Sequence, residues 1–291
     1  MATLPAGRLL RLHALRTAAA RVPRELTRAL PYAIVLGVAL GLVLVVGAHL
    51  SNAQPSEKRP FGWPGPASFE NGVAMVRGDL LLAATIPALL LGARALDHRA
   101  PGVDGPMALA RAASWHLLAL GLGAVLAAAI GAWGASRTPF DAWMAFVVAH
   151  GLLAMSFYAI GFAWAATLRR HAVAAAVATW AFFVLLFENA IQWRVMREAG
   201  YNRLLAGDFP TWFYVAQALS PLSAYRGILI LWRDGFRTYR EQVALQYAQL
   251  PGWMNPGVFS AFMIALWIAL PIGLALGAWR WRQKRKAAVA A

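Results

Sequence analysis

Long apolar runs alternate with short polar segments along almost the whole chain. Six of these runs have about 17 residues or more, which is enough for an α-helix to cross the roughly 30 Å hydrocarbon layer of a bilayer. Proline at position 87 interrupts the second run, although neighbouring helices can satisfy the carbonyl that such a kink frees. The pattern predicts an all-α integral membrane protein with six transmembrane helices. The predicted spans are Tyr32–Leu50, Leu80–Leu96, Trp115–Trp133, Ala142–Leu168, Ala172–Trp193 and Phe259–Trp279.

Three further segments are too charged or too short to be spans. Residues Arg8–Arg28 carry leucine and valine among six arginines, which is typical of an amphipathic helix in the cytoplasmic headgroup layer. Pro23 is expected to bend that helix. Before the last span, a Ser-Pro pair separates the apolar runs Trp212–Leu219 and Ala224–Trp232. Runs of this length are predicted to form short re-entrant or interfacial helices.

The basic residues predict the orientation of the chain. They precede the first span, occupy the turn after the fourth span at Arg169 and Arg170, and fill the tail after the last span. With six spans these flanks share one side, and the positive-inside rule makes that side cytoplasmic. We therefore expect a multi-pass protein of the cell (inner) membrane with both termini in the cytoplasm. Its predicted parts are a cytoplasmic amphipathic helix at 1–31, a transmembrane domain at 32–279 with outer loops at 51–78 and 194–258, and a basic tail at 280–291.

Composition narrows the class of protein. Of the 291 residues, 60% are hydrophobic and 13% are charged, whereas soluble domains have about 25% charged residues. The spans use nearly all of the chain, so we expect no catalytic domain outside the membrane. The net charge of +15 is compatible with nucleic acid, but the basic residues gather at the ends of apolar runs, where they contact headgroups. Membrane lipid is therefore an expected partner and nucleic acid is not.

Few side chains in the predicted spans have a chemistry that the membrane does not explain. Glu188 lies in the fifth apolar run, where a charge costs at least about 2.5 kcal/mol. It is expected to line a pathway, to bond across a dimer interface, or to reach the outer interface near Gln192 and Arg194. His150 lies in the fourth span and Asp141 at the outer end of that span. A lone intramembrane histidine is more often a partner for a neighbouring helix than a ligand.

The sequence indicates neither a cofactor nor an active site in this chain. His49 and His116 are predicted at opposite ends of the membrane, too far apart to share an iron. No Gly-rich phosphate loop, His-Glu-x-x-His or Gly-x-Ser-x-Gly motif is present. The chain is therefore not expected to be an enzyme or to hold a metal, and any ATP that drives it must bind to another subunit.

Three stretches carry a family resemblance. Pro87–Asp97 reads PALLLGARALD, Ala165–His171 reads AATLRRH and is followed by WAFFVLLFE at Trp180–Glu188, and Leu219–Arg226 reads LSPLSAYR. In this order they resemble the ABC-2 type permeases, and among them the permeases of nitrous-oxide reductase maturation. The stretches are similar to the second span with its coupling segment, to the basic turn with the fifth span, and to the family's Asn-Pro-x-x-x-[Phe/Tyr]-Arg stretch.

The resemblance implies the transmembrane permease subunit of an ABC transporter. In such a transporter, two copies or one copy and a similar permease enclose the path, and a separate ABC ATPase subunit binds ATP. The implied candidates for the pathway or the dimer interface are Glu188, His150, Asp141, Pro221, Tyr225 and Arg226. The implied candidates for coupling to the ATPase are Arg16, Arg24, Asp97, Arg99, Arg111, Arg169 and Arg170.

One segment departs from the family. The family has a coupling helix between spans two and three, whereas Asp97–Pro106 is shorter and contains two prolines and two glycines. The N-terminal helix and Leu109–Trp115 would then carry more of the docking. This departure supports an alternative, a non-transporting membrane scaffold or maturation factor for a partner complex. A polytopic membrane enzyme is a third class, disfavoured because titratable groups at matching depth are expected only near Asp141 and Glu188.

Overall fold

The computed structural model describes residues 6–53, 69, 73, 77–97, 105–134, 138–187, 190, 193–194, 197–198, 211–232, 253 and 255–290. The regular elements of this part are all helical, without a strand. In chain order they are α1 (Ala6–Ala53), α3 (Arg77–Ala93), α4 (Pro106–Gly134), α5 (Phe140–Leu168), the 3-10 turn η2 (Arg169–His171), α6 (Ala172–Ala181), the π-helical stretch η3 (Phe182–Phe187), α9 (Thr211–Leu219), α10 (Pro221–Trp232), α12 (Pro256–Phe262), the π-helical stretch η5 (Met263–Ala269) and α13 (Leu270–Ala290).

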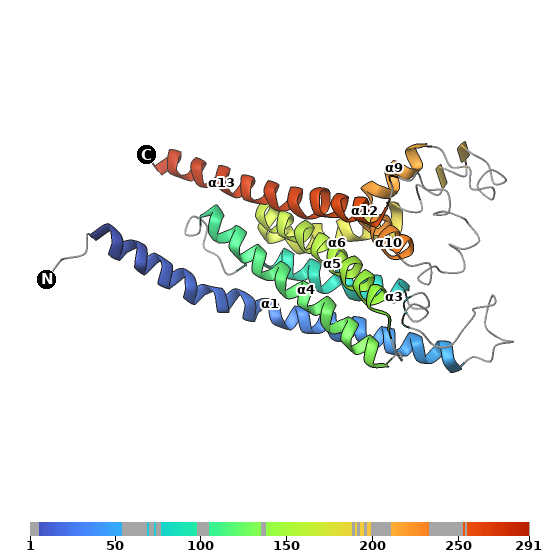
Figure 1. Ribbon diagram of the computed structural model, residues 1–291. Coiled ribbons are helices and arrows are strands. Elements are labelled where there is room, and N and C mark those ends of the chain that lie inside the picture. Colours follow the sequence, from blue (N-terminus) through green and yellow to red (C-terminus); the bar gives the residue numbers. More distant parts are fainter. Residues whose placement is uncertain are drawn as a thin grey trace.

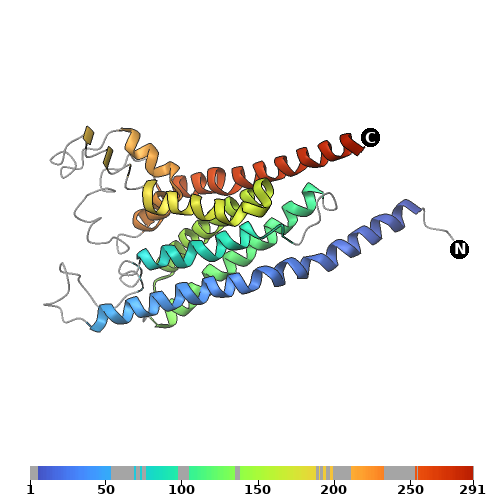
Figure 2. The same cartoon turned by 180° about the vertical axis from the view of Figure 1, so that it is seen from behind.

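The helices form a bundle around α5. This helix contacts α3, α4, α6, α10, η5 and α13, while α1 packs mainly on α4. The start of α1 and the end of α13 lie at one end of the bundle, and α9, α10 and α12 lie at the other (Figures 1 and 2). We call these the terminal end and the α10 end.

Four helical stretches are long and apolar enough to cross a membrane: Arg24–His49, Pro106–Gly134, Phe140–Phe187 and Pro256–Arg285. They confirm the prediction of a helical protein that can span a membrane. The apolar part of α3, Leu80–Ala93, is shorter and contains Pro87. The stretch Phe140–Phe187 includes the fourth predicted span and most of the fifth. Length and composition therefore do not confirm the predicted count of six.

Within this stretch the chain reverses direction at η2. Arg169, which follows α5, has a φ of 43°, a conformation that residues other than glycine rarely adopt. Trp164 of α5 donates a hydrogen bond from Nε1 to Oγ1 of Thr179 in α6, over 2.9 Å. This bond, and the contacts between α5 and α6, show that the two helices form a hairpin around the predicted basic turn.

The predicted N-terminal helix and the first span form one continuous helix. α1 runs without interruption from Ala6 to Ala53, through Pro23 and Pro31 (Figure 1). The expected boundary at residue 31 is therefore not a break in the secondary structure. The change from a basic to an apolar composition alters what surrounds a helix, but it supplies no stop signal such as a C-terminal glycine. Each proline removes one backbone donor, which helices of membrane proteins tolerate.

The two short helices before the last span are present, as predicted. Ser220 separates them and caps α10, because its Oγ accepts from the N–H of Ser223 over 3.3 Å and its carbonyl accepts from Ala224 over 2.8 Å. Nine of the twelve residues of α10 are buried. The helix packs against α5 and α12, with Gly227 against the ring of Phe259. α10 is therefore packed inside the bundle.

Glycines set the closest helix crossings. A Cβ on Gly92 of α3 would lie 2.1 Å from the carbonyl oxygen of Tyr158 in α5, and Gly161 of α5 meets the α3 backbone in the same way. A second close approach joins α1 and α4 at Gly37 and Gly123. Small residues allow such backbone contact between membrane helices, whose association depends on packing because the lipid tails are as apolar as the side chains.

Candidate functional site

The first candidate cluster lies where α10 packs on α5. His150 is completely buried, with Nδ1 at 3.1 Å from the carbonyl oxygen of Phe146 and Nε2 at 2.9 Å from the hydroxyl of Tyr225. A carbonyl only accepts, so Nδ1 carries the hydrogen, and Nε2 accepts from the tyrosine hydroxyl. These two bonds fix one neutral tautomer of His150 and connect α10 to α5.

Ring contacts complete this cluster. The ring centroids of Phe146 and His150 are 4.0 Å apart, and those of His150 and Tyr225 are 4.9 Å apart in an edge-to-face arrangement. The structure therefore brings together two of the predicted pathway or interface residues, His150 and Tyr225. Pro221 is buried at the start of the same helix. Arg226, the next residue after Tyr225, is partly exposed.

The remaining pathway candidates are not part of this cluster. Asp141 is exposed in the first turn of α5, nine residues before His150 and therefore about 14 Å away along the helix axis. Glu188 lies outside the residues that the structure describes. The fold consequently brings His150 and Tyr225 together, with Pro221 four residues before Tyr225 on α10, but it does not bring Asp141 to them.

Two π-helical stretches meet beside α9. Phe183 of η3 and Trp267 of η5 have ring centroids 4.9 Å apart, edge to face. The indole Nε1 of Trp267 donates to the carbonyl oxygen of Leu219, the last residue of α9, over 2.9 Å. Such stretches occur frequently at functional sites. Hydropathy contains no signal for them, because the extra residue in the turn leaves the apolar composition unchanged.

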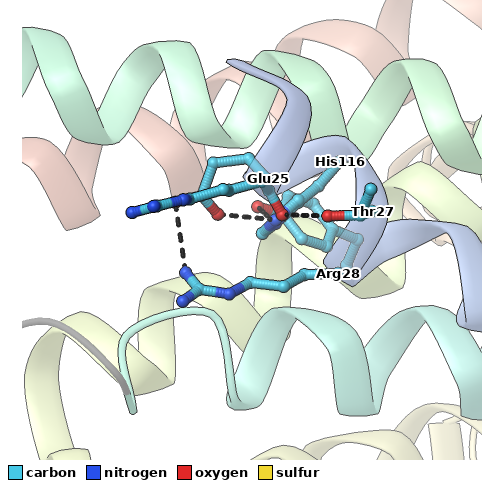
Figure 3. A network of polar contacts seen from close by, with 6 residues as sticks. Glu25, Thr27, Arg28 and His116 are labelled. Atoms are coloured by element: carbon cyan, nitrogen blue, oxygen red, sulfur yellow. Dashed lines mark hydrogen bonds and ion pairs between the residues drawn. The ribbon is translucent and has the colours of Figure 1, made fainter. Parts of the chain in front are cut away.

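The second candidate cluster joins α1 and α4 (Figure 3). His116 of α4 is 2% exposed, and its Nδ1 lies 3.0 Å from the hydroxyl of Tyr158 in α5. Its Nε2 lies 3.3 Å from Oε2 of Glu25 in α1, at an angle that does not make a hydrogen bond. Glu25 is also 3.5 Å from Nη1 of Arg28. We name Glu25, Arg28, His116 and Tyr158 the α1–α4 cluster.

The α1–α4 cluster corrects the expectation that titratable groups match in depth only near Asp141 and Glu188. His116 was expected at the cytoplasmic end of its span, and Glu25 lies close to the start of α1's apolar stretch. The contact could have been predicted only from the knowledge that α1 and α4 pack side by side and run in the same direction. The sequence contains no evidence of that pairing. His49 is 24 residues from Glu25 on α1, or about 36 Å along the axis, so it cannot share a ligand with His116.

A cavity of about 450 Å³ adjoins the α1–α4 cluster. It opens between α1, α4 and the turn that follows α3, in which the N–H of Asp97 bonds to the carbonyl of Arg94 over 3.1 Å. We call it the α1–α3 cavity. Its lining consists of Glu25, Arg28, Tyr32, Leu91, Arg94, Ala95, Asp97 and His116.

The basic turn and the basic tail meet at the terminal end. The guanidinium of Arg282 in α13 donates to the carbonyl oxygens of Ala166 and Thr167 at the end of α5. The guanidinium of Arg169 lies over the ring of Trp279, 5.8 Å from its centroid. Arg282 therefore satisfies carbonyls that the end of a helix leaves without intrahelical partners. The turn and the tail, two of the flanks predicted on one side, are in direct contact.

The coupling candidates occupy different surroundings. Asp97 lines the α1–α3 cavity, while Arg24 and Arg111 are exposed on α1 and α4. Arg170 is exposed in the η2 turn, next to the half-buried Arg169. The side chain of Arg16 and the whole of Arg99 lie outside the described part.

An exposed polar contact lies near α9. Arg194 Nε donates to Glu198 Oε1 over 2.9 Å, and Trp212 Nε1 donates to Glu198 Oε2 over 2.7 Å. These hydrogen bonds hold the pKa of the Glu198 carboxyl below its usual value. The Arg194 guanidinium also lies over the Trp212 ring at 5.1 Å. The contact connects the segment after the fifth predicted span to α9.

Among the described residues, no group of three or more His, Asp and Glu side chains is placed to hold a metal ion. Comparison of the chain with protein-family models and with curated proteins finds no match.

Proposed function

We propose that this chain is the transmembrane permease subunit of an ABC transporter. A second copy or a similar permease would complete the translocation path, and a separate ATPase subunit would bind the ATP. The observation that carries the proposal is the burial of α10 inside the bundle, against α5 and α12. Twelve helical residues extend about 18 Å, which is too short for the roughly 30 Å hydrocarbon layer. A helix that crosses only part of the hydrocarbon layer must end against protein or a water-filled cavity, where its terminal backbone groups can be satisfied. Interrupted helices of this kind are typical of transport pathways.

The proposal includes six crossings. The hairpin at Arg169 supports separate crossings by α5 and by α6 with η3, and α3 packs along α5 in the same direction as α5 (Figure 1). With six crossings the basic start of α1, the η2 turn and the basic end of α13 share one side, which the positive-inside rule makes cytoplasmic. The terminal end is then the inner end, and the α10 end is the outer one.

We assign the outer gate to the contact between α10 and α5. The hydrogen bond between Tyr225 and His150 is available only while α10 lies against α5, so it favours the closed arrangement. Opening would separate the two side chains and leave buried polar groups that water in the path must then satisfy. A gate built in this way changes its contacts between two states, as a driven conformational change requires.

We assign ATPase docking to the exposed beginning of α4. Met107 is 78% exposed beside the exposed Arg111. α4 continues from Pro106 to Gly134 as one helix, so a displacement of its first turns moves the whole helix. The α1–α4 cluster would transmit part of that displacement to α1.

The scaffold or maturation factor is the second candidate, and one observation favours it. α3 ends at Ala93 and passes into a turn, and the first turns of α4 belong to the same helix as the predicted span. The stretch Leu109–Trp115, which was expected to carry part of the docking, is therefore a continuous part of α4. A chain that only binds a partner complex has no need of a separate coupling element.

Copurification separates the two candidates. The tagged chain, expressed in its native membrane, is expected to retain an ABC ATPase subunit and to stimulate its ATP hydrolysis. Met107→Glu combined with Arg111→Glu should release the ATPase, whereas Trp253→Glu, a matched change of an exposed residue near the α10 end, should not. If the intact chain retains no ATPase, the transporter proposal fails and the scaffold takes its place.

A topology experiment tests the six crossings. A reporter that is active only outside the cytoplasm should be silent when fused after Arg170 and active when fused after Gly207. Activity after Arg170 would refute the proposed side of the η2 turn, whichever partner the chain binds.

A further inference from the structure

We infer that the α1–α3 cavity binds the phosphoethanolamine headgroup of a membrane phospholipid. The inference goes beyond the proposed function, because it concerns a resident lipid and requires no ATPase. The cavity of about 450 Å³ has room for such a headgroup, and its lining contains both guanidinium and carboxylate groups.

Nitrogen donors from three residues border the cavity. Arg28 and Arg94 contribute guanidinium groups from α1 and from the turn after α3. The third donor is Nε2 of His116, which is buried and has no hydrogen-bond partner in the described part. Nε2 lies 3.3 Å from a carboxylate oxygen of Glu25. Without a hydrogen, the lone pair of Nε2 would face a lone pair of that oxygen, so this nitrogen carries a hydrogen. Guanidinium and imidazole N–H groups together suit a phosphate.

Two carboxylates restrict the ligand further. Glu25 and Asp97 line the same cavity and balance the charges of the two arginines. They would repel a purely anionic headgroup or inorganic phosphate, and they can accept hydrogen bonds from an ammonium group. A phosphate ester that carries a primary ammonium group satisfies both the nitrogen donors and the two carboxylates. A choline headgroup has no N–H to donate, so ethanolamine is preferred.

The depth of the cavity and the surface beside it indicate a lipid. The apolar stretches Arg24–His49 and Leu80–Ala93 begin and end at this level, where a helix leaves the headgroup layer. Val35 and Leu42 follow Arg28 and Tyr32 on the same face of α1, at helical spacing. They are 56% and 54% exposed. An acyl chain attached to a headgroup in the cavity would therefore meet a continuous apolar stripe.

Native mass spectrometry in detergent tests the inference on the full chain. The purified chain should retain phosphatidylethanolamine in preference to phosphatidylcholine and phosphatidylglycerol. Arg94→Gln should weaken retention about tenfold, as expected for loss of a hydrogen bond to a charged group. Asp97→Asn should remove the preference for ethanolamine over choline. Both side chains are exposed, so the variants should keep the wild-type elution volume in size exclusion.

The matched control is Arg280→Gln, an exposed arginine of α13 that should leave retention unchanged. If Arg280→Gln loses as much phosphatidylethanolamine as Arg94→Gln, the loss reflects a general attraction of basic residues for lipid, and the inference is overturned. Equal retention of the three headgroups would overturn it as well. If soluble glycerophosphoethanolamine displaces the lipid at matched concentration, the assignment to a membrane lipid is wrong.

Discussion

Replacing Gly92 by alanine tests the crossing of α3 and α5. The new Cβ would lie 2.1 Å from the carbonyl oxygen of Tyr158 and 2.9 Å from the backbone nitrogen of Phe162, whereas ordinary contact begins at 3.4 Å. The obstruction is backbone, which cannot rotate away as a side chain can. The two helices must therefore separate locally by about 1.3 Å, the difference between the first distance and ordinary contact.

The expected cost follows from two opposing terms. Overpacking of this kind costs about 1–3 kcal/mol, and the better helix propensity of alanine returns up to about 1 kcal/mol. The net loss should be about 1–2 kcal/mol, or about 2–8 °C in the midpoint of thermal unfolding by the scaling for soluble domains of similar size. The displacement also moves Tyr158, which holds Nδ1 of His116.

Heating followed by fluorescence-detected size exclusion in detergent measures this midpoint. Gly273→Ala in α13 is the matched control, because nothing lies within 4 Å of its added Cβ and it should be neutral or slightly stabilising. Gly161→Ala, the reciprocal change on α5, should behave like Gly92→Ala. Equal midpoints for Gly92→Ala and Gly273→Ala would show that α3 and α5 do not cross at Gly92 and Gly161.

Three other changes test local contacts. Tyr225→Phe leaves Nε2 of His150 without its donor and should lower the same thermal midpoint, with a cost of about 0.6–1.7 kcal/mol; an unchanged midpoint would contradict the bond. The hydrogen bonds from Arg194 and from Trp212 that lower the pKa of Glu198 stabilise the fold above the ordinary carboxyl pKa of about 4.3 and are lost only as pH falls through the lower value. Fluorine NMR of fluorinated Trp212 should show a transition below that pH, absent in Glu198→Gln, and a transition at or above it would refute the assignment. Arg282→Leu should destabilise the chain by about 1–3 kcal/mol, because the end of α5 loses two donors to its carbonyls; a wild-type midpoint would exclude that role.

Local features of the sequence determined most of the secondary structure. The apolar runs predicted helices that can span a membrane, because run length and composition are properties of neighbouring residues. The Ser-Pro pair predicted the boundary between α9 and α10, since Ser220 is a capping residue and proline suits a first helical turn. The basic pair at Arg169 and Arg170 marked the reversal between α5 and α6, because basic residues gather where a span leaves the hydrocarbon layer.

Only the tertiary structure decided which helices are neighbours. The contact of His116 with Glu25 and that of His150 with Tyr225 join residues 91 and 75 positions apart, and no local pattern specifies such a pairing. The burial of α10 and the cavity beside α3 depend on the same packing, which glycines at the helix crossings permit. The continuity of α1 was also missed, since composition changes there while the backbone conformation does not. Hydropathy reports the solvent that a segment prefers, whereas the shapes of facing side chains select its partners in the bundle.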